Sequence, residues 1–264
     1  MLRVGWDDLS EGARSAVEAQ TGPVLKAQTV TEGLNCEIAA LLHTSTGKVF
    51  AKGIRSDHPR AWTQQMEAMI NPWVLAVTPR LLWHVQADGW DVLVFEHIEG
   101  RHADYSPGSQ DLPKIVEELQ LLGQIPAPDL PLKRAEQRWA GYVDDESTLE
   151  LLRGDRLLHT DLNPLNVLVN STARFVDWAW PTRGAAWIDP ACLILMLIAA
   201  GHTAAEAEAW ARHVPSWSSA SEQAICAFAK ASVRVWDEIA QADPTPWKQQ
   251  LAAAAREWLI HRLP

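Results

Sequence analysis

The feature that most constrains this chain is a polar segment set between apolar runs. Residues 159–166 read HTDLNPLN, with the spacing H-x-D-x-x-x-x-N, and Asp177 follows a second apolar run. Phosphoryl transfer from a nucleotide needs one carboxylate that orients the attacking hydroxyl and accepts its proton. It also needs an amide and a second carboxylate that hold magnesium against the phosphates. Asp161, Asn166 and Asp177 fit these three roles in that order.

The local pattern predicts how these residues are presented. Strands are predicted over 156–159, 166–170 and 173–177, with a turn at 170–172. A hairpin of this kind is expected to bring Asn166 and Asp177 to one end, where their oxygens suit Mg²⁺. Each residue alone is typical of an ordinary turn or strand end. The complete ordered pattern favours the catalytic interpretation.

Composition excludes several classes of protein. The chain has 264 residues, 47% of them hydrophobic, which is enough for a full core in two lobes. The net charge of −10 disfavours a nucleic-acid partner and suits a cationic substrate, although acidity also favours solubility in general. Residues 191–200 form the longest apolar run and are too few to span a bilayer. The N-terminus lacks the apolar segment of a signal peptide, and Cys36, Cys192 and Cys226 show no pairing pattern, so we expect a cytoplasmic protein with reduced thiols and no membrane partner.

Hydrophobic periodicity divides the chain into two parts. The first is predicted to contain helices over 7–20 and 58–70 and strands over 24–30, 36–44, 48–54, 81–86 and 91–97. The second is mostly helical, with periodic segments at 111–123, 134–142, 189–201, 204–213, 218–240 and 246–262. We therefore expect an α+β chain of two lobes: residues 1–98 with a small antiparallel sheet and one helix against it, and residues 99–264 with a larger, mainly helical lobe.

The segment from His159 to Leu193 resembles the aminoglycoside phosphotransferase family, which has the two-lobed protein-kinase-like fold. HTDLNPLN is similar to the family's H-x-D-L-x-P-x-N loop, and Asp177-Trp178 to its magnesium-binding D-W. The resemblance implies that Asp161 is the catalytic base and that Asn166 and Asp177 bind Mg²⁺.

The same resemblance implies two supporting roles. Asp189, in the turn that opens the next predicted helix, is expected to anchor the catalytic loop through hydrogen bonds to its backbone. His159 is expected to pack beneath the loop rather than to take part in catalysis.

The resemblance also implies a nucleotide site for ATP, with GTP left open. Lys52 would contact the phosphates and pair with Glu67, while Lys48 is a weaker candidate. Backbone groups near Glu96 and Ile98 would bind the adenine edge. The phosphate-covering loop, residues 30–37, has the single glycine Gly33 instead of a G-x-G-x-x-G pattern, and one glycine still allows backbone N–H groups to face a phosphate.

Two features favour a small-molecule acceptor over a protein. Thr160 replaces the arginine of H-R-D, which in protein kinases binds a phosphorylated activation loop. Only eleven residues separate Asp177 from Asp189, without an A-P-E element. The expected function is transfer of the γ-phosphoryl group to a hydroxyl of a small molecule. Acceptors known for the family include aminoglycoside and peptide antibiotics, choline-like alcohols and sugars, and the sequence does not choose between antibiotic resistance and metabolism.

An amine-bearing acceptor would need acidic ligands in the helical part. The candidates are Asp189, Glu206, Glu208, Glu222, Asp237 and Glu238. A Ser/Thr protein kinase and a non-catalytic, kinase-like nucleotide-binding module remain the alternatives. A metal-dependent hydrolase is disfavoured because the histidines lack the spacing of metal ligands. No feature indicates an oligomeric state.

Overall fold

The fold was analysed on a computed structural model that describes residues 3–33 and 36–263. The chain divides into two compact units. The first contains the chain up to Gly100 together with Val176–Ala179, and the second contains Arg101–Phe175 and the residues from Trp180 onward. The segment that carries Asp177 therefore belongs with the N-terminal unit, although it lies far along the chain. Each unit is described by itself.

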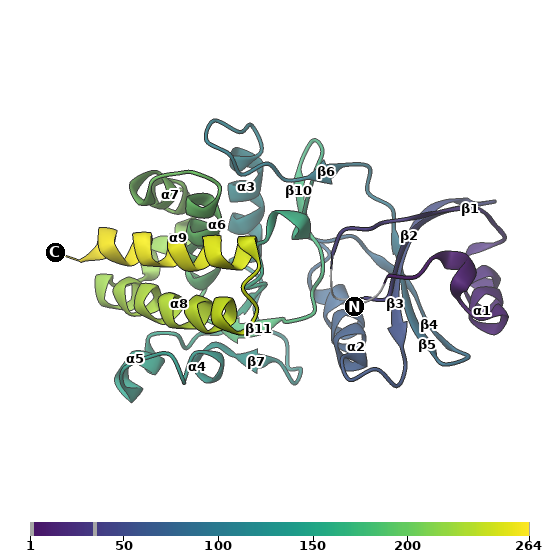
Figure 1. The fold of residues 1–264 in the computed structure, drawn as a ribbon, viewed down its shortest axis with the longest axis horizontal. Coiled ribbons are helices and arrows are strands. Elements are labelled where there is room, and N and C mark those ends of the chain that lie inside the picture. The colour runs from purple at the N-terminus through teal and green to yellow at the C-terminus, as the bar shows by residue number, and fades with distance from the viewer. Residues whose placement is uncertain (1–2, 34–35, 264) are drawn as a thin grey trace. The chain divides into compact units, whose positions relative to one another are not determined.

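The first unit contains a five-stranded antiparallel sheet in the order β1-β2-β3-β5-β4 (Figure 1). Its strands are β1 Val24–Thr29, β2 Ile38–Thr44, β3 Gly47–Arg55, β4 Leu81–Ala87 and β5 Trp90–Glu96. Asp88 and Gly89 join β4 to β5 with φ of 49° and 79°. An Asp-Gly pair tolerates positive φ at both positions, which is what a two-residue hairpin needs. This turn fixes the register of the last two strands.

Two helices accompany the sheet: α1 Glu11–Thr21 and α2 Ala61–Ile70. The helix predicted over 7–20 starts later, because the Ser10 side chain accepts a hydrogen bond from the Ala13 backbone and caps α1. Trp6–Asp8 forms a separate 3₁₀ turn. Both helices pack on the sheet, whereas the sequence predicts one helix against it. Val17 of α1 lies in the same core as Trp6.

The alternation of side chains along β3 separates two environments. Val49 and Ala51 join the core formed with α1. Lys52, the next residue, therefore points to the opposite face of the sheet. Helix α2 contacts both β3 and β5, and Glu67 on it is buried. The strand period thus brings a buried lysine to the helix that carries a buried glutamate.

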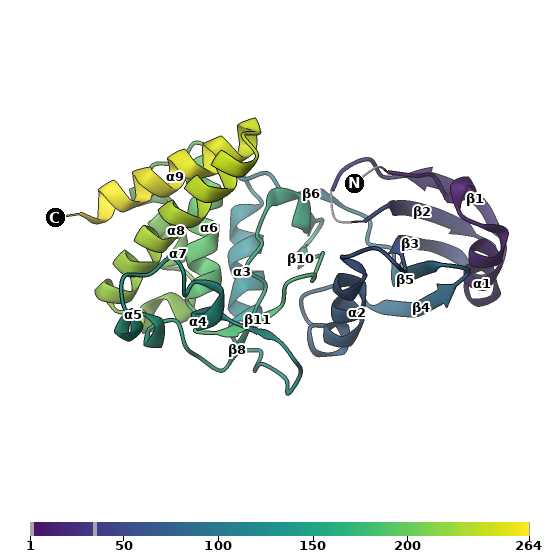
Figure 2. The same cartoon turned by 60° about the horizontal axis from the view of Figure 1, so that its bottom comes forward.

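The second unit contains seven helices and two small three-stranded sheets in its described residues. Its helices are α3 Leu112–Leu122, α4 Ala135–Arg138, α5 Glu146–Glu150, α6 Ile188–Ala199, α7 Ala204–Ala211, α8 Glu222–Ala242 and α9 Pro246–Arg262 (Figure 2). The sheets have the orders β10-β9-β6 and β7-β11-β8. Their strands are β6 Arg101–His102, β7 Lys133–Arg134, β8 Arg156–Leu158, β9 Val167–Val169, β10 Ala173–Phe175 and β11 Thr182–Gly184.

The helix predicted over 134–142 is largely wrong. Only Ala135–Arg138 is helical, and Lys133–Arg134 pairs instead with β11 as the parallel strand β7. Strands β6, β7 and β11 have two or three residues each, which is too short for an alternating pattern to be recognised. Pairing with distant residues decides these segments, so local periodicity misses them.

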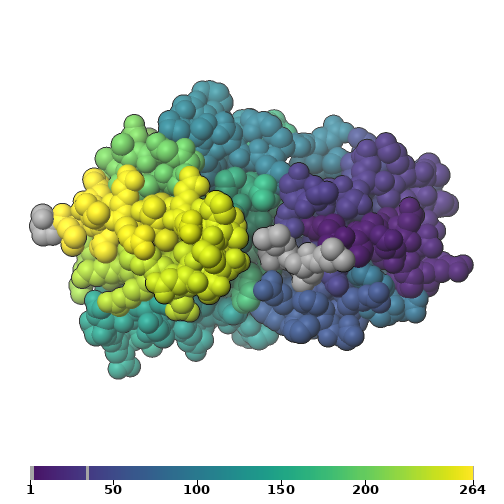
Figure 3. Space-filling view, viewed as in Figure 1, coloured from purple at the N-terminus to yellow at the C-terminus, as the bar shows by residue number. Residues whose placement is uncertain are grey.

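The helical unit is built around α6 and an aromatic cluster. Ile188–Ile198 of α6 is buried throughout, and α9 packs against both α6 and α8. Helices α8 and α9 form the yellow-green and yellow surface in Figure 3. The Phe228 ring on α8 lies 5.3 Å from Trp139, 5.6 Å from Trp187 and 6.4 Å from Trp258, measured between ring centroids. This cluster joins α8 and α9 to the residue that follows α4 and the residue that precedes α6.

Cys36, Cys192 and Cys226 are free thiols. None of the helices in the described part of the chain combines the length and the apolar character of a membrane-spanning helix.

We predict that Phe228→Ala strongly destabilises the protein. Phe228 is 1% exposed, and loss of a buried phenylalanine ring leaves a cavity that costs about 3–5 kcal/mol of unfolding free energy. Ile260→Ala on α9 is the control, because Ile260 is 69% exposed and its truncation should cost less than about 0.5 kcal/mol. Denaturant unfolding followed by tryptophan fluorescence measures both. Similar losses for the two variants would show that the aromatic cluster is not a main source of stability.

Candidate active site

In the first unit, one buried lysine is held by two carboxylates. Lys52 Nζ lies 2.6 Å from Glu67 Oε2 and 2.9 Å from Asp177 Oδ1. Lys52 and Glu67 are 8% and 4% exposed. The ion pair expected between Lys52 and Glu67 is present, and Asp177 is the additional partner. Three segments distant in sequence therefore meet at one ammonium group.

The electrostatics of this cluster leave an excess of negative charge. Burial opposes the charged form of Lys52, but Asp177 and Glu67 outweigh burial and raise its pKa, so the ammonium stays protonated. Asp177 has φ of 64°, a left-handed conformation that is uncommon outside glycine. One cation facing two carboxylates can accommodate a further positive charge.

The chemistry of these residues fits magnesium. Among residues 3–33 and 36–263, no group of three or more His, Cys, Asp or Glu side chains is placed to hold a metal ion by itself. Mg²⁺ in nucleotide-dependent enzymes typically takes one or two protein oxygens and completes its shell with phosphates and water. The first unit offers such an oxygen ligand in the carboxylate of Asp177, and the second unit offers one in the amide of Asn166.

The expected phosphate-covering loop is held by an arginine that the sequence analysis did not identify. Arg3 Nη2 donates to the carbonyls of Glu32 at 2.7 Å and Gly33 at 2.8 Å, and its Nη1 donates to the Cys36 carbonyl at 2.8 Å. Gly33 has φ of 83°, which explains the glycine. Leu34 and Asn35 of the same loop lie outside the described residues. No motif marks Arg3, because its place depends on the long-range bond from the Val4 N–H to the Glu37 carbonyl.

The residues expected at the adenine edge follow β5. The Glu96 N–H donates to the Arg80 carbonyl at 2.9 Å, and the Glu96 side chain accepts from the Arg80 N–H at 2.8 Å. The Ile98 N–H has no hydrogen-bond acceptor among the described residues. A backbone N–H without a protein acceptor is suited to a base edge. Lys48 pairs with Glu99 at 3.0 Å as an exposed ion pair, in contrast to the buried Lys52.

In the second unit, Asp189 holds the start of the HTDLNPLN loop. Its carboxylate accepts the His159 N–H at 2.9 Å and the Thr160 N–H at 2.7 Å. The backbone contacts expected for Asp189 are therefore present. Burial raises the pKa of Asp189, while these two N–H groups favour its charged form. Thr160 has φ of 66°, so the anchored backbone is also strained.

Side chains then fix the rest of this loop around Asp161. The Asn166 side-chain amide donates to the Asp161 carbonyl at 3.2 Å, and the buried Tyr105 hydroxyl donates to the Leu162 carbonyl at 2.9 Å. The His159 ring accepts the Asp161 N–H at 3.3 Å and lies 5.8 Å from the Phe175 ring. His159 is 2% exposed, which agrees with packing rather than proton transfer. The loop is thus held from several sides while Asp161 is half-buried.

Arg138 is a second residue that sequence reasoning missed. Its Nη1 donates to Thr160 Oγ1 at 2.5 Å, to Thr182 Oγ1 at 2.6 Å and to the Trp180 carbonyl at 3.4 Å. It thereby joins the catalytic loop to β11. The segment from 134 to 142 was expected to be an ordinary helix, so no pattern distinguished this arginine.

The acidic residues considered as ligands for an amine all have intramolecular roles. Glu208 accepts from Trp258 Nε1 at 2.8 Å and pairs with Arg262 at 2.5 Å. Glu206 belongs to the capping box of α7. The remaining ones are engaged as follows: Asp189 with backbone N–H groups, Glu222 with Arg262, Asp237 with Arg256, and Glu238 with Tyr142. The structure does not group them into a site.

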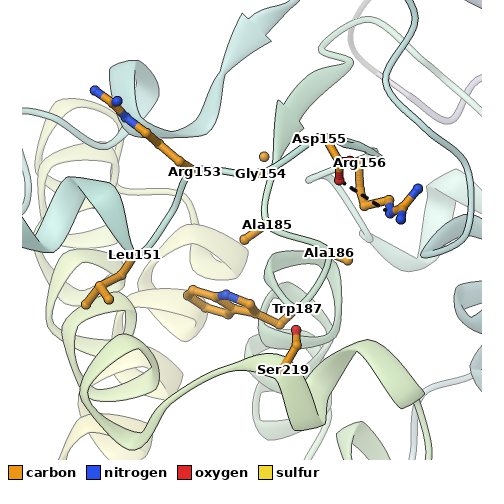
Figure 4. A pocket seen from close by; sticks show the side chains of 10 residues that line it. Leu151, Arg153, Gly154, Asp155, Arg156, Ala185, Ala186, Trp187 and Ser219 are labelled. Atoms are coloured by element: carbon orange, nitrogen blue, oxygen red, sulfur yellow. Dashed lines mark ion pairs between the residues drawn. The ribbon is translucent and has the colours of Figure 1, made fainter.

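Two cavities lie away from the expected catalytic residues. One of about 370 Å³, in the first unit, is lined by Arg55, Ser56, Asp57 and Gly89. The other, of about 330 Å³ in the second unit, is bordered by Leu151, Trp187 and Ser219 and by the Asp155–Arg156 ion pair (Figure 4). Neither cavity is lined by Lys52, Asp161, Asn166 or Asp177. The site is therefore defined by chemistry and hydrogen bonding rather than by these cavities.

Several solved structures resemble the fold of this chain. No protein-family model and no curated protein matches the sequence. The choline kinase LicA from Streptococcus pneumoniae is similar in structure, with a TM-score of 0.63 at 16% identity over 93% of this chain and 96% of that one. The aminoglycoside phosphotransferase APH(3'')-Id from Streptomyces rimosus has a TM-score of 0.54 at 18% identity over 76% and 90% of the two chains.

The chain has the protein-kinase-like fold of these small-molecule kinases. At such low identity the similarity concerns the fold. Two of the similar structures contain bound ligands: LicA with AMP, and APH(3'')-Id with ADP and streptomycin. This kinase-like fold agrees with the α+β architecture expected from the sequence and with the resemblance of the HTDLNPLN loop.

We predict that Lys52→Ala weakens nucleotide binding and Lys48→Ala does not. Loss of charge-assisted hydrogen bonds to phosphate should raise the dissociation constant of Mg·ATP by roughly 10- to 100-fold. Calorimetric titration measures this dissociation constant. The titration is done below the unfolding temperature of the variant, because Lys52→Ala leaves Glu67 and Asp177 without their cation and so destabilises the protein. Equal affinities for Lys52→Ala and the unmodified protein would remove Lys52 from the nucleotide site and make Lys48 the candidate.

Proposed function

We propose that this protein is a magnesium-dependent phosphotransferase that moves the γ-phosphoryl group of ATP to a hydroxyl of a small molecule. The observation that carries the proposal is the buried Lys52 shared by Glu67 and Asp177. Buried titratable groups drawn together from distant segments, with strongly perturbed pKa values, are typical of functional sites. The kinase-like fold and the adenine nucleotides bound to LicA and APH(3'')-Id support ATP, with GTP as the variant to test.

The residues divide the chemistry among them. Asp161 would orient the acceptor hydroxyl and take its proton as the oxygen attacks the γ-phosphorus, and ADP would leave on the opposite side. Lys52 would stabilise charge on the phosphates, and Gly33 and its loop would supply backbone N–H groups. Asn166 and Asp177 would hold Mg²⁺, which neutralises phosphate charge when bound. Backbone groups of Glu96 and Ile98 would orient the adenine.

One acceptor class to test is a cationic alcohol. The choline kinase and the streptomycin-bound phosphotransferase are named for such substrates, and the net charge of −10 is favourable for them. Assays with Mg²⁺ and ATP or GTP across amino alcohols, aminoglycosides, peptide antibiotics and sugars test the proposal. Acceptor-dependent ADP release supports it. Nucleotide binding without turnover would favour the non-catalytic module, and phosphorylation of proteins alone would favour a protein kinase.

We predict that Asp161→Asn lowers the turnover number by roughly 10²- to 10⁴-fold and leaves Mg·ATP affinity unchanged, because the amide cannot accept the hydroxyl proton. Coupled detection of ADP measures turnover, and calorimetry measures affinity. Asp155→Asn is the matched control, since Asp155 is exposed and belongs to the same unit. Near-normal turnover of Asp161→Asn would exclude Asp161 as the base.

We predict that Asp177→Ala weakens binding of Mg·ATP more than binding of ATP in excess chelator, because only the first complex uses the carboxylate as a metal ligand. Titrations with and without Mg²⁺ measure this difference. Asp57→Ala, an exposed change in the same unit, should leave both affinities as they are. An unchanged Mg·ATP titration for Asp177→Ala would contradict the ligand assignment.

A further inference from the structure

The Arg138 guanidinium is only partly used by the protein. All three of its hydrogen bonds leave from Nη1 and go to neutral oxygens of Thr160, Trp180 and Thr182. Nε and Nη2 have no acceptor among the described residues, and neither is among the buried atoms without a partner, so both reach solvent. A guanidinium carries five N–H groups in a planar fork. Three of them, on Nε and Nη2, remain available to a ligand.

Arg138 also lacks the ion pair that the partly buried Arg174 and Arg262 have. Arg174 pairs with the buried Glu118 at 2.9 Å, and Arg262 pairs with Glu208. No carboxylate lies within ion-pair distance of Arg138 in the described part of the chain. Burial lowers the pKa of Arg138, an effect opposed by Cys192 and by the charges of Asp161 and Asp189. A half-buried cation without a paired anion is costly, and an anionic ligand would offset this cost.

A second cation lies beside the same segment. Lys133 Nζ lies 4.2 Å from the centre of the Trp180 ring, and the Trp180 carbonyl is one of the oxygens bound by Arg138. Burial and the Arg138 charge both lower the pKa of Lys133, so the two cations are close enough to repel each other. Arg138 and Lys133 therefore add positive charge to a region that also holds the carboxylates of Asp161 and Asp189, although the net charge of the chain is −10.

The acidic residues do not reverse this local charge. Those considered as amine ligands are engaged in the capping box, ion pairs and hydrogen bonds described above. The charge nearest the catalytic loop, apart from Asp161 and the anchoring Asp189, is that of Arg138. A purely cationic acceptor would approach a guanidinium with unused N–H groups and would be repelled.

We propose that the acceptor carries an oxyanion, a carboxylate or a phosphate, in addition to its hydroxyl, and that the Nε and Nη2 groups of Arg138 bind this oxyanion with Lys133 close by. This inference rests on the proposed function and names its substrate class. An amino group on the same molecule is compatible, so amino acids with a hydroxyl, hydroxy acids and phosphorylated polyols are the classes to test. A planar guanidinium binds either oxyanion through two parallel N–H groups.

The experiment compares alcohols that differ only in the oxyanion. Ethanolamine is paired with serine, 3-aminopropanol with homoserine, ethylene glycol with glycerate, and glycerol with glycerol phosphate. The kcat/KM for each is measured with Mg·ATP, and the ratio within a pair is the readout. We expect the charged member to be preferred by roughly 10- to 100-fold, the range for charge-assisted hydrogen bonds. The glycerate and glycerol phosphate arms distinguish a carboxylate from a phosphate.

Variants then assign the preference to Arg138. Arg138→Gln should bring the ratio close to one, mainly through KM of the charged acceptor, and Arg138→Lys should retain part of it. The ratio cancels any general loss of catalysis from disturbing Thr160, because such a loss affects both members of a pair equally. Arg183→Gln is the matched control: Arg183 follows Thr182 on β11, is exposed, and should leave the ratio unchanged.

Calorimetric titration of the same pairs with a non-hydrolysable ATP analogue and Mg²⁺ separates this inference from the proposed function. Tighter binding of the charged members, lost in Arg138→Gln, supports the oxyanion site even if no acceptor is turned over. If the unmodified protein turns over and binds both members of every pair equally well, the oxyanion site is overturned, whichever variants fold. A preference for charged acceptors that survives in Arg138→Gln would overturn it as well. A fall in kcat that is equal within each pair would make Arg138 a positioning residue for the loop.

Discussion

The helical unit depends on one buried carboxylate, that of Asp189. It lies in the first turn of α6 and accepts the N–H groups of His159 and Thr160 at 2.9 and 2.7 Å. These bonds hold the backbone of Thr160 at a positive φ that would otherwise revert to a relaxed conformation. Because Asp161 is the next residue, the conformation of Thr160 sets where the Asp161 backbone and side chain begin. A carboxylate at a helix N-terminus is stabilised by the helix dipole, so α6 both buries the anchor and favours its charge.

The N-terminal unit contains a buried charge of the opposite sign. Its buried cation, Lys52, is held by Glu67 from α2 and by Asp177 from a segment that the chain reaches only after β10. Desolvation of a lysine is acceptable because both carboxylates lie within 3 Å of Nζ. The same arrangement leaves one carboxylate in excess, which agrees with the magnesium that phosphoryl transfer requires. Charge balance and chemistry thus support the same assignment.

The distribution of charge in the helical unit bears on the choice of acceptor. Choline and streptomycin are cations, whereas the residues beside the HTDLNPLN loop include Arg138, without a carboxylate partner in the described residues, and Lys133 over Trp180. Several acidic residues of the helical unit are engaged in internal ion pairs and caps, such as those of Glu208 and Glu206. Recognition of an acceptor depends on the few charges that remain available to a ligand, so net charge alone does not identify the acceptor.

The sequence by itself determined the chemistry-bearing motif and the α+β order of elements, because these follow from short spacings and from the periods of strands and helices. The resemblance of the motif to a known family implied the Lys52–Glu67 pair. The tertiary structure alone decided that Arg3 holds the glycine loop, that Asp177 joins Lys52, and that Arg138 reaches Thr160. Each of these contacts joins residues 20 or more positions apart through irregular or very short segments. Periodicity carries no information about such contacts, since they arise from how packed elements bring distant backbone together.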